Sequence, residues 1–156
     1  MKTRIVIVIV SLALCLVGIS VAVAEDANMG TWKLNETKSK FPAGATKNST
    51  VVYEAAGDDV KVTVDGTDKD GKAVHNEWTG KFDGKDYQVT GDSNMNARSY
   101  ERIDARTLKL TGKKDGKVIS EGRIAVSADG KTRTVKLTAS DSTGKKEKST
   151  AVYDKQ

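Results

Sequence analysis

The sequence has few of the residues on which most catalytic and metal sites depend. Its 156 residues include one cysteine, one histidine and one proline. The cysteine, Cys15, lies in an apolar N-terminal run, so a chain that loses this run has no thiol and no disulfide. The one histidine, His75, has no second imidazole with which to build a zinc site, and no thiol with which to form a nucleophile–base pair. Glycine-rich phosphate loops are also absent. We therefore expect no enzyme, no metal site and no cofactor.

The N-terminal region has the pattern of a secretory signal peptide. Lys2 and Arg4 precede an uncharged run, residues 5–24, which ends in the small-x-small sequence Ala-Val-Ala. A basic start, an apolar stretch and such a cleavage site together mark an export leader. We interpret residues 1–24 as a signal peptide and residues 25–156 as one domain, exported to the periplasm or secreted. The alternative is an uncleaved anchor, since a run of this length can span a bilayer. The leader would then be the only membrane contact.

The charge balance disfavours nucleic acid as a partner. Removing Lys2 and Arg4 from the 26 basic residues leaves 24 against 21 acidic ones, a net charge of +3. The two signs are interspersed along the chain, which is typical of a soluble surface rather than of a binding patch for a polyanion.

Residues after the leader alternate between apolar and polar side chains, as in β-strands with one buried face. No stretch there keeps a 3.6-residue period for three helical turns. Asp-Gly and Gly-Lys pairs separate the segments, and Asp-Gly is typical of tight antiparallel hairpins. After a first strand at residues 30–35, the predicted strands are residues 51–55, 60–64, 73–82, 86–90, 98–103, 107–111, 118–126, 132–139 and 147–153.

These segments predict an all-β fold, an antiparallel up-and-down meander of about ten strands. A meander leaves two exposed edges unless it closes, so the economical arrangement is a closed barrel. A two-sheet β-sandwich is the alternative. Within the first strand Trp32 faces the interior, and we expect it to plug one end of the core as a structural residue. Residues 36–48 then predict a loop with one helical turn, which Phe41 tethers to the core.

Two short motifs resemble the calycins, the group of lipocalins and fatty-acid-binding proteins. Gly30-Thr31-Trp32-Lys33-Leu34 resembles their Gly-x-Trp opening, and Ala151-Val152-Tyr153-Asp154-Lys155 is similar to the last strand of the intracellular lipid binders. The resemblance implies a lipocalin-like barrel that holds a ligand. Two features depart from the lipid binders. Ala151 stands where they have an arginine for the ligand carboxylate, and the chain has no room for their helical lid. The opening also resembles small exported bacterial proteins of unassigned function that share the start Gly-Thr-Trp-Lys-Leu-Asn.

Aromatic residues that share inward faces are the candidate binding site. Such residues could line a cavity with apolar walls and a few polar tips, which suits a small apolar or amphipathic ligand. Arg102 would offer a charged tip for an acidic head group, and Gly80 would leave space between two rings. The candidate ligand-binding residues are Trp78, Phe82, Tyr100, Arg102 and Tyr153. The alternative is that they fill the core of a structural or protein-interaction module that binds no ligand.

Two polar features have simple structural interpretations. His75 alternates with Trp78 and so faces solvent. The acidic segment at residues 65–71 resembles a calcium-binding loop, but glycine occupies its first ligand position and strands flank it, so we expect a polar hairpin turn.

Overall fold

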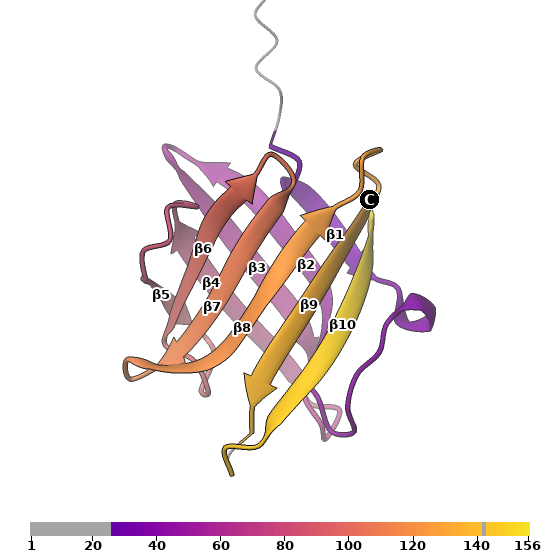
Figure 1. The fold of residues 1–156 in the computed structure, drawn as a ribbon, viewed down its shortest axis with the longest axis vertical. Helices are drawn as coiled ribbons and strands as arrows, with labels where there is room; N and C mark the ends of the chain where they lie inside the picture. Colours follow the sequence, from indigo (N-terminus) through magenta and orange to yellow (C-terminus); the bar gives the residue numbers. More distant parts are fainter. Residues whose placement is uncertain (1–25, 142) are drawn as a thin grey trace, which may run out of the picture.

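The computed structural model of the chain describes residues 26–141 and 143–156, which form a ten-stranded β-barrel (Figure 1). The one helical element in this part of the chain is a 3₁₀ turn, η1, at Glu36–Lys38, within the predicted loop. The strands are β1 (Gly30–Leu34), β2 (Lys47–Ala56), β3 (Asp59–Thr67), β4 (Ala73–Gly80), β5 (Tyr87–Thr90), β6 (Ala97–Asp104), β7 (Thr107–Lys114), β8 (Lys117–Val126), β9 (Thr132–Ser140) and β10 (Lys146–Lys155). The predicted signal peptide, residues 1–24, lies outside the described residues, as does Cys15.

The sheet closes because β1 pairs with both β2 and β10. Trp32 lies opposite Val51 on one side and Lys155 on the other, and every other strand pairs antiparallel with its sequence neighbours. Closure removes both open edges. The all-β meander and its closure into a barrel are therefore confirmed, and the alternative of a β-sandwich is wrong. A closed β-barrel is also the architecture that the resemblance to the calycins implies.

The turn between β7 and β8 shows why Asp-Gly pairs marked the hairpins. Asp115 and Gly116 both have positive φ, at 50° and 79°. Two consecutive positive φ values define the tight turn whose twist matches that of antiparallel strands, and Asp-Gly tolerates them best.

Trp32 lies where the sequence places it, at one end of the core. Its side chain is fully buried, and its indole Nε1 donates a hydrogen bond to the Asn28 carbonyl oxygen over 2.8 Å. Asn28 itself is fully buried, so residues 26–29 cover this end of the barrel. Phe41 packs half-buried against the core cluster, as the tether of the loop was expected to do. Trp32 is thus buried as the sequence predicts, and its structural role stays a prediction.

Two expectations about the end of β4 are wrong. The strand stops at Gly80, so Phe82 lies in the following connection rather than on the strand itself. The space beside Gly80 is also occupied, since a Cβ atom there would lie 2.4 Å from Cγ of Tyr87. Gly80 is therefore a site of close packing against an aromatic ring, and no open pocket adjoins it.

Candidate functional site

Three of the predicted aromatic residues, Trp78, Phe82 and Tyr100, meet inside the barrel as one packed cluster. Tyr100 forms an edge-to-face pair with Trp78, with ring centroids 4.7 Å apart, and another with Phe82 at 5.7 Å. Tyr53 and Tyr87 extend the cluster with further edge-to-face contacts. Such pairs stabilise a core beyond the area that they bury. The cluster fills the part of the interior enclosed by β2–β6.

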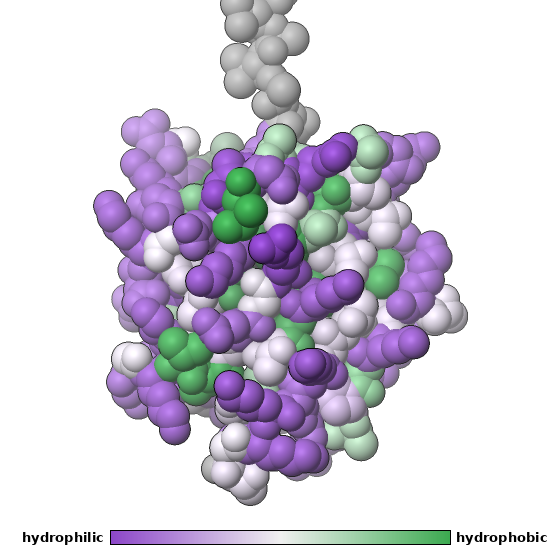
Figure 2. Space-filling view, viewed as in Figure 1, coloured by the Kyte–Doolittle hydropathy of each residue, from purple (hydrophilic) through white to green (hydrophobic). Residues whose placement is uncertain are grey.

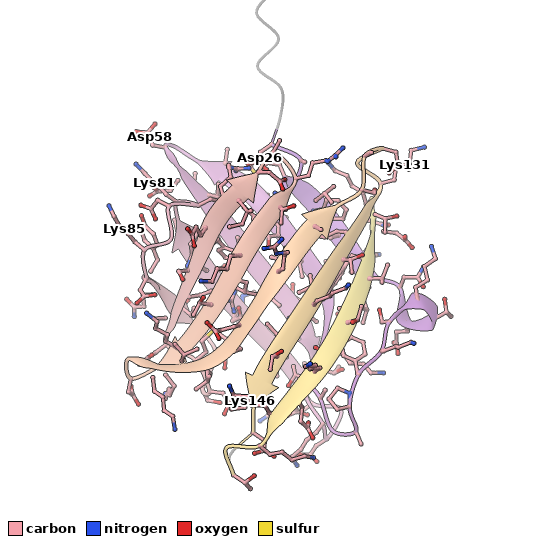
Figure 3. All side chains as sticks on the ribbon, in the orientation of Figure 1. Asp26, Asp58, Lys81, Lys85, Lys131 and Lys146 are labelled. Carbon is pink, nitrogen blue, oxygen red and sulfur yellow. The ribbon has the colours of Figure 1, made fainter. Side chains whose placement is uncertain are left out.

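Arg102 lies at the end of the barrel that residues 26–29 cover. Its Nη2 atom donates to the Asp26 carboxylate, and its guanidinium lies over the Phe82 ring at 5.1 Å. The side chain is 37% exposed, and the stick view places Asp26 at the same end of the barrel (Figure 3). This predicted head-group residue therefore already has a carboxylate partner.

Tyr153 contacts a second arginine that points into the barrel. Arg133 lies directly opposite Tyr153 in the pairing of β9 with β10, and only 3% of it is exposed. Its Nη2 atom donates to the Tyr53 hydroxyl over 2.7 Å. The guanidinium carbon lies 4.7 Å from the Tyr53 ring centroid, 5.5 Å from that of Tyr153 and 5.9 Å from that of Trp32. Three rings therefore enclose this cation, in contacts that favour a positive charge.

The Arg133 guanidinium keeps hydrogen-bonding capacity that the protein does not use. Its Nε and Nη1 atoms are buried without a hydrogen-bond partner, and Arg133 forms no ion pair among the described residues. A buried cation without a counter-charge loses its hydration free energy, and its contacts with the protein replace only a small part of that loss. The interior therefore presents two unused donors on an uncompensated positive charge.

Two tyrosines beside Arg133 stay protonated at neutral pH. Burial raises the pKa of Tyr53 well above its ordinary value, and burial also raises that of Tyr153, while the nearby Arg133 charge acts in the opposite direction. Desolvation disfavours the phenolate, so neither tyrosine neutralises the guanidinium. The charge at the centre of this site is therefore positive.

The inward face of β9 continues from Arg133 with apolar residues. Val135, Leu137 and Ala139 share the parity of Arg133, and all three are half-buried, as is Ser149, which lies opposite Leu137 on β10. These residues lead away from the end that residues 26–29 cover and toward the turn between β9 and β10 (Figure 1). The interior thus combines a buried cation near its covered end with an apolar, partly accessible strip that runs toward the other end.

A second interior arginine has a different environment. Arg98 is buried, and its Nη2 atom donates to the Asn76 side-chain oxygen over 3.1 Å, while its carbonyl accepts a hydrogen bond from Trp78 Nε1. An amide oxygen satisfies part of this guanidinium without neutralising it. Arg98 therefore adds to the positive potential inside the barrel.

The polar features singled out in the sequence lie on the surface. His75 is exposed, with its Nδ1 atom 2.7 Å from the Asp65 carboxylate. The Asp68 carboxylate accepts hydrogen bonds from the backbone amides of Asp70 and Lys72, which makes this segment a polar turn. Residues 26–141 and 143–156 contain no cluster of three or more histidine, cysteine or acidic residues suited to a metal ion. In the same residues, no helix has the length and hydrophobicity needed to cross a membrane.

Comparisons with known proteins give no family for this chain and find two similar solved structures. No known family model and no curated protein matches the chain. The solved structure of EF1p2_mFAP2b bound to DFHBI is similar with a TM-score of 0.47 and 10% identity, over 83% of this chain and 94% of that one. The redesigned β-barrel mFAP1 bound to DFHBI is similar with a TM-score of 0.44 and 17% identity, over 83% of this chain and 95% of that one.

Sequence reasoning missed Arg133, although its signal is visible. Arg133 alternates with Val135, Leu137 and Ala139, so the parity of the strand points its side chain inward. An arginine in a row of inward-facing apolar residues is unusual, because arginine is almost never fully buried unless it is paired. Such a residue can therefore be recognised from the sequence.

Proposed function

We propose that this protein is an exported, non-catalytic β-barrel that binds a small amphipathic molecule carrying an acid group. The observation that carries the proposal is Arg133, a buried guanidinium whose Nε and Nη1 atoms have no protein partner. An acid group beside it would form charge-assisted hydrogen bonds, which are among the strongest in proteins. The same contact would supply the missing counter-charge.

The rest of the ligand would be apolar. From Arg133 the accessible inward strip consists of Val135, Leu137 and Ala139. An alkyl or aromatic tail would therefore extend along β9, with the acid group innermost and the tail toward the turn between β9 and β10. This orientation also sets the direction of entry, because residues 26–29 cover the opposite end. Arg133 replaces Arg102 as the proposed partner of the ligand's acid group, because the Arg102 guanidinium already pairs with Asp26.

A matched pair of probes tests the proposal directly. Dodecanoate and dodecanol share one alkyl chain, and only dodecanoate carries a charge. Titration calorimetry on the chain beginning at Glu25 should show that dodecanoate binds about tenfold or more tightly than dodecanol, since a hydrogen bond to a charged group contributes about 1.5–3 kcal/mol. Binding should also quench tryptophan fluorescence saturably.

The variant Arg133→Met should remove the preference for dodecanoate. Arg102→Met is the matched control, because it deletes an arginine whose guanidinium is already paired, and it should keep the preference. Equal binding of the two probes to the wild type would exclude Arg133 as an anion receptor. Failure of both probes, together with no co-purified mass in native mass spectrometry of protein from its own cell envelope, would favour the structural or protein-interaction module.

Export rests on the leader pattern and has its own test. The intact mass of the protein recovered from its native cell envelope should correspond to a chain that begins at Glu25. A full-length, membrane-bound product would support the uncleaved anchor instead.

A further inference from the structure

A groove of about 500 Å³ crosses the outer surface of β7–β10, and of the proposed ligand site it shares only Leu137 and the neighbouring Ser149. Two rows of outward-facing residues form its walls, and each row follows the register of the strands. One wall is Lys109, Arg123, Lys136 and Thr150, and the other is Glu121, Thr138 and Lys148. Between the walls lie Gly122, Leu137 and Ser149, which pair across β8, β9 and β10. We refer to this feature as the transverse groove.

One wall of the transverse groove is a row of like charges. Lys109 lies directly opposite Arg123, which lies directly opposite Lys136, and like charges in such positions repel each other. Within the described residues, none of these three cations forms an ion pair, and neither does Lys148 on the other wall. Glu101 lies directly opposite Lys109 on β6, but among the described residues no carboxylate forms an ion pair with any cation of the row.

The outer surface of β3 and β4 shows the opposite arrangement. There Lys61 pairs with Glu77 at 2.7 Å, and His75 approaches Asp65 at the same distance, both across neighbouring strands. Opposite charges on neighbouring strands stabilise a sheet, whereas like charges in such positions destabilise it. The uncompensated row on β7–β9 thus differs from the outer surface of β3 and β4.

We propose that the transverse groove binds an acidic polysaccharide. Adjacent strands are about 4.8 Å apart, so the cations from β7 to β10 span about 14 Å, the length of a short run of sugar units. Thr138 and Thr150 stand among the cations and offer hydroxyl groups. The face of these strands shows mainly hydrophilic and neutral residues, with only isolated hydrophobic ones (Figure 2). Alternating cations and hydroxyls suit a chain that presents both carboxylates and hydroxyls.

The same residues disfavour other polyanions. Single-stranded nucleic acid usually stacks its bases on aromatic side chains, and no aromatic residue lines the transverse groove. An acidic peptide that adds to a sheet needs an open edge, and the barrel has closed its edges. A polysaccharide needs neither feature.

Binding of polygalacturonate, which carries one carboxylate on each sugar, tests the proposal. The chain beginning at Glu25 should bind it at low ionic strength, with an affinity that falls as salt is added, and should not bind neutral dextran. The double variant Arg123→Gln/Lys136→Gln should weaken this binding tenfold or more. Its dodecanoate affinity should stay unchanged, so the transverse groove and the interior site can fail independently.

The matched control removes the same amount of charge elsewhere. Lys81→Gln/Lys85→Gln also deletes two cations, in the connection between β4 and β5, which lies on another side of the barrel (Figure 3). This variant should keep its affinity for polygalacturonate within about threefold. An equal loss in both double variants would mean that net charge alone drives binding, and would overturn the proposal. Tighter binding to single-stranded DNA or to phosphatidylglycerol vesicles would overturn it as well.

Discussion

Arg133 donates a hydrogen bond to the hydroxyl of Tyr53 over 2.7 Å, although the two residues are 80 positions apart in the chain. The barrel brings them together because β9 and β2 lie on opposite sides of the closing strands β10 and β1. The cation thereby lies inside the barrel near its covered end, enclosed by aromatic rings from three strands. This one contact links the closure of the sheet to the proposed binding chemistry.

Replacing Arg133 should stabilise the protein in the absence of ligand. Arg133→Met keeps most of the side-chain volume and removes an unpaired buried charge. We expect the free energy of unfolding to rise by about 1–3 kcal/mol, as found when buried ionic groups are replaced by apolar ones. Loss of the contacts with three rings and of the hydrogen bond to Tyr53 offsets part of this gain. Urea denaturation, read from tryptophan fluorescence, measures the change.

A fall in stability would contradict this account of Arg133. It would mean that the guanidinium mainly holds the core together, with no cost that a ligand could relieve. Higher stability with lost dodecanoate binding would instead be the trade-off expected of a functional residue.

Gly80 and Tyr87 should be coupled energetically. A Cβ atom at position 80 would approach the Tyr87 ring to between 2.4 and 2.7 Å, so Gly80→Ala should cost about 1–3 kcal/mol of stability through overpacking. In a Tyr87→Ala background the same substitution should cost clearly less, because the clashing ring is gone. A double-mutant cycle in urea measures this coupling. Additive effects would mean that the backbone shifts to admit the new methyl group.

Most of the fold could be predicted from local pattern. Alternation located all ten strands, with ends that differ from the observed ones by a few residues, and Asp115-Gly116 shows why turn chemistry separated them. These features depend on neighbours along the chain, which the sequence displays directly. Closure followed from the need to hide two edges, which is a general constraint on meanders.

The site was predicted in part, and most of the errors have one physical origin. Trp78, Tyr100 and Tyr153 point inward as their parity requires, but what each contacts depends on how the barrel closes. Tyr87 fills the space beside Gly80, and residues from the N-terminal segment reach Arg102. Such contacts between distant segments are not encoded in any local pattern. Arg133 is a separate case, because its inward parity is visible in the sequence, and it was missed because a charged residue on a strand normally faces water.

Trp32 should be one of the most costly residues to truncate. It is fully buried, and its indole donates to the Asn28 carbonyl. Trp32→Ala should lower the free energy of unfolding by about 3–5 kcal/mol, the range for a packed tryptophan. Trp32→Phe keeps an aromatic ring but loses the hydrogen bond, so it should cost less. An unchanged urea midpoint for Trp32→Ala would show that the first strand is peripheral to stability.

Stability should decline at alkaline pH through the buried tyrosines. Burial raises the folded-state pKa of Tyr53 and Tyr153 above the ordinary value of about 10. Between that value and the raised one, the unfolded chain releases these protons while the folded chain keeps them. Proton release then favours the unfolded state, so the contribution is fully present well below pH 10 and is lost as the pH rises beyond it.

The variant Tyr153→Phe isolates this effect from the titration of surface lysines. It removes one buried phenol and leaves every lysine in place, so the decline in urea midpoint above pH 10 should become shallower. Near-ultraviolet absorbance should also show one late-titrating phenol fewer in the variant than in the wild type, because a buried hydroxyl ionises only when the barrel opens. Parallel stability profiles in the two proteins would mean that Tyr153 reaches solvent without unfolding. The interior around Arg133 would then be wetter than its packing implies, and water would supply the hydrogen bonds that we assign to a ligand.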